Sequence, residues 1–153
     1  MPRYLQLAIW IIGYLGVSYG LGLITQGNIP SWYAALEKPS FNPPNWVFPI
    51  VWTALYIMVA TAGWHLWQSG AARSLKLIFI VYTAMNWLWT PIFFGAHQLA
   101  IGFFWIAALT LLNAVFIAKA WNIVRLSAVL MVPLFFWSVF AGLLNYSIWT
   151  LNG

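Results

Sequence analysis

The sequence of 153 residues is poor in charge and contains no cysteine. Glu37 is its only acidic residue, and charged residues of both signs make up 5% of the chain. A single carboxylate excludes carboxylate dyads, carboxylate metal cages and acid-driven proton relays. The absence of cysteine excludes thiolate nucleophiles, cysteine-ligated zinc, iron–sulfur clusters and disulfides. We therefore expect neither a metal site nor a conventional acid–base enzyme.

The shortage of charge also excludes a soluble fold. Soluble domains usually carry about 25% charged residues, because charged side chains cover most of a surface that faces water. Here 64% of the residues are hydrophobic, and tryptophan alone occurs 12 times. The formal charge of +5 comes from cations that are scattered along the chain, which argues against a nucleic-acid interface. The composition is that of an integral membrane protein.

Long uncharged runs predict five membrane-spanning helices. A span needs about 20 mostly apolar residues. The runs that meet this length are approximately residues 4–25, 46–67, 75–94, 99–118 and 126–149. Short loops join them, apart from a longer polar and proline-rich segment from Gln26 to Pro44. No internal repeat is visible, so we expect residues 1–153 to form a single all-α membrane domain, a bundle of five transmembrane helices.

The basic residues predict the orientation of this multi-pass protein. Cations are enriched in loops on the cytoplasmic side of a membrane. One side of the predicted bundle holds five of them, and Lys38 stands alone on the other; the five are Arg3, Arg73, Lys76, Lys119 and Arg125. We therefore predict that the N-terminus lies inside and the C-terminus outside, with the long first loop outside.

Residues near the span ends are typical of a membrane interface. Tryptophan is enriched at both interfaces of a bilayer, and the tryptophans near predicted span ends are Trp46, Trp64, Trp67, Trp121 and Trp149. We interpret these five as an aromatic belt. We likewise interpret His65 and His97 as interfacial side chains rather than haem ligands.

Polar and small residues within the spans indicate helix contacts. Amide side chains in a bundle must find partners, and such hydrogen bonds contribute roughly 0.6 to 2 kcal/mol. Asn86, Asn113 and Asn145 are either links between helices or part of a cavity. Gly16 and Gly20 are spaced for close helix approach, within one bundle or between subunits.

Aromatic stripes on three spans leave two interpretations open. They comprise Phe48, Trp52 and Tyr56; Asn86, Trp89 and Phe93; and Pro133, Trp137, Ala141 and Leu144. Each set shares a helix face. Such stripes are usually close-packed core, but they can also wall a pocket for a flat apolar ligand. Pro91 and Pro133 are expected to kink their helices, which can open a cavity.

The first loop is unusually aromatic for a connector. From Trp32 to Trp46 it contains three prolines and four aromatic side chains besides a single Glu-Lys pair. Ordinary connections are shorter and more polar. We interpret the segment as a lid over the outer mouth of the bundle; the alternative is a segment lying flat among the lipid headgroups.

The ordered motifs of the chain resemble one family closely. In the loop they are Trp32-Tyr33, Lys38-Pro39, Pro43-Pro44 and Trp46, and later Val51-Trp52, Asn86-Trp87, Pro133, Trp137 and Leu144-Asn145-Tyr146. They are similar to the signature of the TspO/MBR family, which includes bacterial tryptophan-rich sensory proteins and the mitochondrial translocator protein, or peripheral-type benzodiazepine receptor. The resemblance covers the whole chain.

This resemblance implies a five-helix bundle, commonly a homodimer, in a bacterial cell membrane. It implies a pocket that opens on the side of the first loop and binds protoporphyrin IX, other tetrapyrroles and benzodiazepine-site drugs, with no obligatory cofactor. Tyr33, Pro43 and Pro44 are then lid residues. The implied pocket residues are Trp52, Asn86, Trp89, Phe93, Trp137, Ala141 and Leu144. Thr150 stands where the cholesterol-recognition pattern expects a basic residue, so sterol binding through that pattern is not expected.

Three functions remain open at the level of sequence. The first is a membrane receptor or sensor that binds a tetrapyrrole. The second is light- and oxygen-dependent porphyrin degradation, for which the resemblance implies Trp52 and Trp137 as the participating residues. The third is a transporter of porphyrins or other hydrophobic metabolites. Ion coupling is disfavoured because the spans hold no ionisable group away from their ends.

Overall fold

The computed structural model describes residues 1–153 and contains five long helices and no strand. The helices are α1 (Arg3–Asn28), α2 (Val47–Gln68), α3 (Arg73–Thr90), α4 (Leu99–Ala120) and α5 (Arg125–Asn152). Two π-helical turns, η1 (Ile29–Tyr33) and η2 (Pro91–Gly95), continue α1 and α3. Each of the five segments is long and apolar enough to cross a membrane. The predicted all-α bundle of five spans is confirmed.

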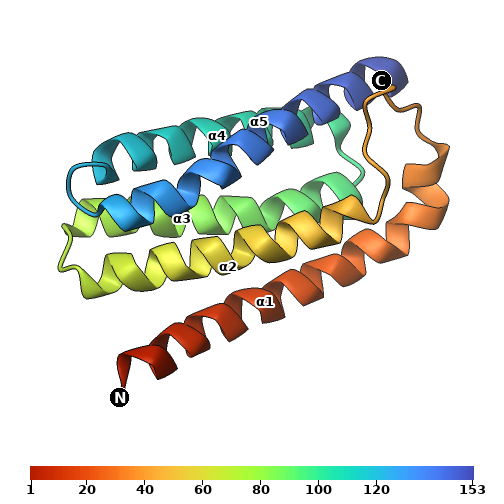
Figure 1. Ribbon diagram of the computed structural model, residues 1–153. Coiled ribbons are helices and arrows are strands. Elements are labelled where there is room, and N and C mark those ends of the chain that lie inside the picture. Colours follow the sequence, from red (N-terminus) through yellow and green to blue (C-terminus); the bar gives the residue numbers. More distant parts are fainter.

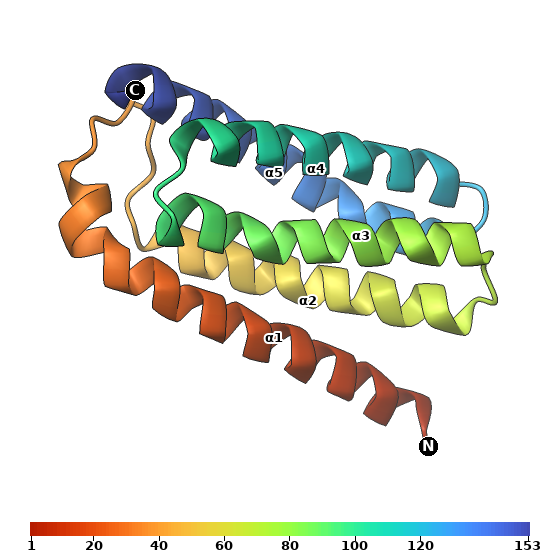
Figure 2. The same ribbon diagram turned by 180° about the vertical axis from the view of Figure 1, so that it is seen from behind.

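The helices lie side by side and alternate in direction (Figures 1 and 2). Helices α2 to α5 form the body of the bundle, and α1 runs along one side of it, mainly against α2. The N-terminus and the C-terminus lie at opposite ends. Large side chains that are fully buried fill the centre, among them Phe79, Tyr82, Phe116, Met131 and Leu134.

The first helix is longer than the sequence predicted. We expected the loop to begin at Gln26, but α1 continues to Asn28 and η1 extends the helical path to Tyr33. Pro30 lies at the junction of α1 and η1, where its missing N–H coincides with the change from α-helical to π-helical bonding. The helical path therefore passes through Pro30, and the extended part of the connector is confined to residues 36–46.

The two prolines within later spans behave differently from each other. Pro91 marks the point at which α3 changes to the wider π-helical turn η2. Pro133 lies inside α5, which remains a single helix from Arg125 to Asn152. Pro91 thus changes the type of helix next to the lid end of the bundle, a consequence that the sequence did not predict.

The two ends of the bundle differ in charge. The N-terminus and the α2–α3 and α4–α5 connections lie together at one end, which we call the basic end (Figure 1). It carries the five cations Arg3, Arg73, Lys76, Lys119 and Arg125. The other end, the lid end, carries Glu37 and Lys38. Which end faces the cytoplasm stays a prediction.

Of the five tryptophans predicted to form the aromatic belt, three are exposed and two, Trp64 and Trp149, are half-buried. Trp46, Trp67 and Trp121 are exposed, as interfacial side chains are. Trp64 is half-buried, and its indole nitrogen is buried without a hydrogen-bond partner. Trp64 therefore belongs to the bundle interior rather than to the belt.

The glycines of α1 do not mediate close packing within the bundle. A Cβ atom added at Gly13, Gly16 or Gly20 would meet nothing within 4 Å. Gly63 on α2 is the opposite case, because a Cβ there would lie 2.5 Å from the Trp10 ring and 2.8 Å from the Phe79 ring. Gly63 thus allows Trp10 of α1 to lie against α2, whereas the α1 glycine face is left open to the surroundings.

A cavity walled by aromatic side chains

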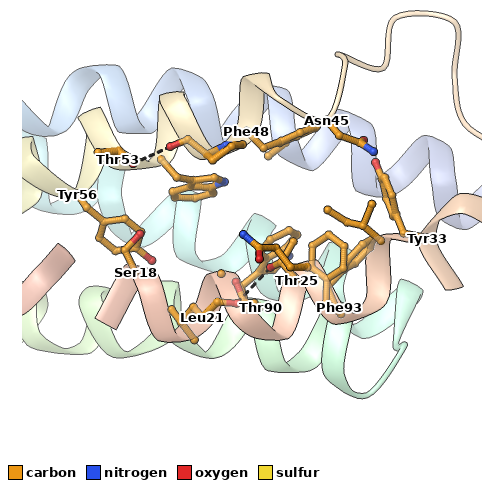
Figure 3. Close-up of a pocket in the computed structure, with 18 of the residues that line it drawn as sticks. Ser18, Leu21, Thr25, Tyr33, Asn45, Phe48, Thr53, Tyr56, Thr90 and Phe93 are labelled. Atoms are coloured by element: carbon orange, nitrogen blue, oxygen red, sulfur yellow. Dashed lines mark hydrogen bonds between the residues drawn. The ribbon is translucent and has the colours of Figure 1, made fainter. Parts of the chain in front are cut away.

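A single large cavity lies in the lid-end half of the bundle (Figure 3). Its volume is about 610 Å³, within the range of roughly 300–1,000 Å³ typical of sites for drug-sized ligands. Helices α1, α2, α3 and α5 and the turns η1 and η2 all contribute to its wall. In Figure 3, Tyr33 and Asn45 face each other at one end and Tyr56 closes the other.

Aromatic rings give the wall both flat faces and edges. Trp89 and Phe93 are stacked, with ring centroids 5.2 Å apart and an interplanar angle of 15°. Trp52 of α2 meets Trp137 of α5 edge to face, at 6.4 Å and 90°. Stacked and edge-to-face pairs are the favoured arrangements of aromatic rings. The wall can therefore contact both the flat face and the edge of a planar ligand.

Two asparagines supply polar groups with different roles. Asn145 is committed to the protein, because its Oδ1 accepts a hydrogen bond from Trp89 Nε1 at 3.3 Å and its Nδ2 donates to the Ala141 carbonyl at 2.7 Å. Asn86 lines the cavity, is only 7% exposed and makes no hydrogen bond with the protein. Asn86 is thus free to bind a polar group of a ligand.

The lid end of the cavity is held by polar contacts within the connector. The Tyr33 hydroxyl donates to Asn42 Oδ1 at 3.1 Å, and Asn42 Nδ2 donates to the Pro43 carbonyl at 3.1 Å. Lys38 Nζ donates to the Leu36 carbonyl at 2.9 Å and lies 4.7 Å from the centroid of the Tyr33 ring. These contacts place the one cation of the lid end beside a residue of the cavity wall.

The last turn of α5 is clasped to the connector. Asn152 Oδ1 accepts a hydrogen bond from the Glu37 backbone N–H at 2.8 Å, and its Nδ2 donates to the Glu37 carbonyl at 2.9 Å. One amide side chain therefore satisfies both backbone groups of a single loop residue, as a neighbouring strand would. This clasp fixes the connector over the end of the bundle.

The mouth of the cavity lies between α1 and the start of α2. The exposed residues of its lining all come from these two helices or from the residues just before α2; they are Tyr19, Gln26, Asn45, Trp46, Pro49 and Thr53. The resemblance implied an opening on the side of the first loop. The exposed lining includes that side and continues down the outer flank of the bundle.

Eight of the ten binding residues named from the sequence line this cavity. They are Tyr33, Trp52, Asn86, Trp89, Phe93, Trp137, Ala141 and Leu144. Pro43 and Pro44 do not line it but lie in the connector, where the Pro44 carbonyl accepts a hydrogen bond from the Val47 N–H at 3.0 Å. Contact of any of the ten with a ligand stays a prediction.

Sequence reasoning missed the contribution of α1. One face of this helix lines the cavity with small and polar side chains, including Ser18, Gly22, Thr25 and Gln26. These residues recur at helical spacing in an otherwise apolar span, a pattern that could have predicted a polar face on this helix. Only the close-approach pattern of the glycines was drawn from α1, and that pattern lies on a different, open face.

The two histidines lie apart from each other and from the cavity. His65 Nδ1 and Ser127 Oγ are 2.9 Å apart, and Ser127 in turn donates to the Ala62 carbonyl. His97, at the lid end, is stacked on Trp32 with ring centroids 4.2 Å apart. Each imidazole thus has a structural contact of its own, and neither lines the cavity.

Comparisons with known proteins agree on one family. The model of the TspO/MBR family matches residues 7–150. Protein CrtK of Rhodobacter capsulatus is 40% identical over 128 residues, which cover 80% of this chain and 79% of that protein. The tryptophan-rich protein TspO of Archaeoglobus fulgidus is 31% identical over 150 residues, 97% of each chain. The translocator protein of Bos taurus is 34% identical over 149 residues, 92% of this chain and 83% of that protein.

Proposed function

The chain belongs to the TspO/MBR family, and from that premise we propose that it is a membrane receptor or sensor whose ligand is a tetrapyrrole such as protoporphyrin IX. The observation that carries the proposal is the cavity itself. It combines stacked and edge-on aromatic rings with one unpaired amide, that of Asn86. A large flat ring gains most from such a wall, because both of its faces are apolar.

The two ends of the cavity suit the two sides of a porphyrin. The apolar ring belongs at the deep end, against Trp52 and Trp137, which are in contact with each other. The propionate groups belong at the lid end, where Lys38 is the single cation. Reorienting Lys38 from the Leu36 carbonyl toward a propionate replaces a hydrogen bond to a neutral acceptor by one between two opposite charges. The same cavity accepts smaller apolar ligands of the benzodiazepine-site type.

The proposal is tested by titrating the purified protein with protoporphyrin IX and following tryptophan fluorescence. Ala141 is buried and lines the cavity on α5. Ala141→Phe should weaken binding by about tenfold or more, which corresponds to roughly 1.4 kcal/mol, because the added ring takes up ligand space.

Val139→Phe is the matched control. Val139 is 41% exposed, is two residues away on the same helix and does not line the cavity. It adds a side chain of the same kind outside the cavity and should leave the affinity unchanged. Wild-type affinity in a folded Ala141→Phe protein removes this wall from the binding site, and the absence of quenching in the wild type removes the tetrapyrrole.

A light- and oxygen-dependent reaction of the bound porphyrin is a second candidate. The contact that favours it is the edge-to-face pair of Trp52 and Trp137 inside the cavity, since indole rings are readily oxidised. Porphyrin loss under illumination in air, compared between the wild type and the variants Trp52→Phe and Trp137→Phe, tests it. Unchanged loss in both variants excludes a role for these two rings. Transport of porphyrins has no comparable contact in its favour.

A further inference from the structure

A second, smaller hollow, open to its surroundings, lies at the basic end, far from the lid; we call it the small cavity. Its volume is about 310 Å³, and it is lined by Met1, Gln6, Ile9, Trp10, Trp67 and Gln68. The Gln6 and Gln68 side chains are hydrogen-bonded to each other there. Its lining includes two amides, Gln6 and Gln68, and two indoles, Trp10 and Trp67, so a small polar molecule that enters it can reach both indoles.

An unbroken series of six oxidisable rings joins the two cavities. In order they are Trp137, Trp52, Tyr56, Tyr14, Trp10 and Trp67, and we call them the aromatic ladder. The successive distances between ring centroids are 6.4, 5.8, 6.4, 6.1 and 5.3 Å. The first three rings line the large cavity, and the last two line the small one. Gly63 makes room for Trp10 within this series.

We propose that the aromatic ladder carries one-electron oxidising equivalents from the large cavity to Trp67. The inference rests on the proposed tetrapyrrole ligand. Tryptophan and tyrosine are the most readily oxidised side chains of a chain that has no cysteine. Electron tunnelling falls steeply with distance, so rings in contact exchange an electron much faster than rings separated by aliphatic side chains. Electron transfer along the ladder is thus a further activity of the bundle, which removes oxidising equivalents from the large cavity.

The first step is a light-driven electron transfer within the large cavity. The photoexcited tetrapyrrole takes one electron from Trp52 and becomes a radical anion, while Trp52 becomes a radical cation. The tetrapyrrole anion then passes its extra electron to dioxygen, which becomes superoxide, and the tetrapyrrole is regenerated. One oxidising equivalent remains on the protein.

Two other rings of the ladder, Trp137 and Tyr14, cannot trap this equivalent by losing a proton. An indole radical cation is trapped when it loses its N–H proton. Trp137 cannot do so, because its indole nitrogen is buried without a hydrogen-bond partner. Tyr14 pairs only with the hydroxyl of Thr83, at 3.2 Å, which is a poor proton acceptor. The equivalent therefore moves on across the two tyrosines, which act as bridging rings.

Trp67 is the place where proton loss becomes favourable. It is 38% exposed beside the small cavity, so water can accept its indole proton. Lys76 Nζ lies 5.7 Å from the Trp67 ring centroid and disfavours a second positive charge there. Proton loss removes that charge and leaves a neutral radical. A reductant of the thiol or ascorbate class, reaching the small cavity, restores Trp67 by giving it one electron and one proton.

Without a reductant the Trp67 radical is converted to a stable oxidation product. The neutral Trp67 radical combines with superoxide and a proton to give a hydroperoxide, which rearranges to N-formylkynurenine. The net change is the addition of one dioxygen molecule to Trp67. Peptide mass spectrometry detects this product at a named residue.

Trp121 separates this route from attack by diffusing singlet oxygen. It lies at the same end of the bundle and is 39% exposed, against 38% for Trp67, but it has no aromatic neighbour in the ladder. Singlet oxygen should oxidise both side chains to a similar extent. Transfer along the ladder should oxidise Trp67 several-fold more than Trp121.

The experiment illuminates the purified protein with protoporphyrin IX in air, after binding has been measured by fluorescence in the same sample. Trp10→Phe keeps a ring in place but removes an oxidisable one, and should abolish the excess of Trp67 product. Trp105→Phe makes the same exchange outside the ladder, on α4, and should leave the excess unchanged. Added ascorbate should lower the Trp67 product while leaving porphyrin binding intact.

Each result bears on a separate claim. Equal oxidation of Trp67 and Trp121, or an excess that survives in Trp10→Phe, overturns the ladder while leaving the tetrapyrrole receptor in place. The absence of porphyrin binding overturns the proposed function and this inference with it. If deuterated water, which prolongs the life of singlet oxygen, raises the two products in parallel, the Trp67 signal is diffusive and the ladder is again overturned.

Discussion

The three asparagines within the spans differ in what their amides touch. Asn113 is fully buried and donates to the Met131 carbonyl at 3.3 Å, so it links α4 to α5. Asn145 positions Trp89 across the gap between α5 and α3. Asn86 has no protein partner and faces the cavity. One residue type thus serves as a link, as a support for an aromatic ring and as a free polar group.

This difference predicts that alanine at one position changes ligand affinity and at another changes thermal stability. Asn86→Ala should weaken a ligand with a polar group by up to about tenfold, since a hydrogen bond contributes roughly 0.5–1.5 kcal/mol. It should leave the melting temperature unchanged, because no hydrogen bond with the protein is lost. Asn113→Ala should lower the melting temperature and leave the affinity unchanged. Fluorescence titration and thermal unfolding in detergent measure the two quantities.

Asn122→Ala is the control for both, since Asn122 is exposed between α4 and α5 at the basic end. It should change neither quantity. If Asn86→Ala binds protoporphyrin IX as the wild type does, the Asn86 amide does not touch that ligand. If it also melts at a lower temperature, Asn86 is a structural link after all.

At the level of elements, much of the bundle could be predicted from charge spacing, because lipid tolerates no charge along a span. The path of α1 could not. Gln26, Asn28 and Pro30 read as a loop, yet they continue a helix whose polar side lines a cavity instead of facing lipid. A local sequence pattern shows which side of a helix is polar, but it does not show whether that side faces lipid, another helix or a cavity.

The same limit explains the ambiguity of the aromatic stripes. On α2, Trp52 lines the cavity, Tyr56 lines it and also packs in the core, and Leu55 and Val59 are packed in the core alone. Spacing places each pair on a helix face but does not say whether that face meets side chains or empty space. The volume left between α1 and the other helices depends on all of their side chains together, so the family resemblance was needed to choose a pocket.

The connector offers a prediction about its clasp. Asn152 binds both backbone groups of Glu37, and Glu37 is the only acidic residue of the chain. A protease that cleaves after glutamate therefore has one site, and that site is held by the clasp. Asn152→Ala should accelerate cleavage at Glu37 by several-fold, because proteolysis requires the backbone to leave the end of the bundle.

A graded variant makes this test specific. Asn152→Asp keeps an acceptor for the Glu37 N–H but loses the donor to the Glu37 carbonyl. Its cleavage rate should therefore fall between those of the wild type and Asn152→Ala. Asn122→Ala, at the opposite end, should be cleaved as slowly as the wild type. Equal rates in all four proteins show that the clasp does not restrain the connector. Slower cleavage on addition of protoporphyrin IX shows that the ligand orders it.

At the scale of the whole molecule, the two ends carry different chemistry. The lid end has the large cavity, and the basic end has five cations and the small cavity. The aromatic ladder is the proposed connection between them. The homodimer implied by the resemblance stays a prediction, and the glycine face of α1, which nothing in the chain covers, is the surface on which to look for it.

The asymmetry of charge predicts the orientation of the protein in the membrane. Loops rich in Lys and Arg stay on the cytoplasmic side, so the basic end should lie inside and the lid end outside. Because the natural chain has no cysteine, single cysteines introduced on the two ends report their accessibility without background. Ser40 in the connector and Asn122 between α4 and α5 are both exposed. In intact bacterial cells, a membrane-impermeant maleimide should label Ser40→Cys, and it should label Asn122→Cys only after lysis. Labelling in the reverse order places the cavity mouth on the cytoplasmic side, and ligand and reductant then approach from sides opposite to those expected.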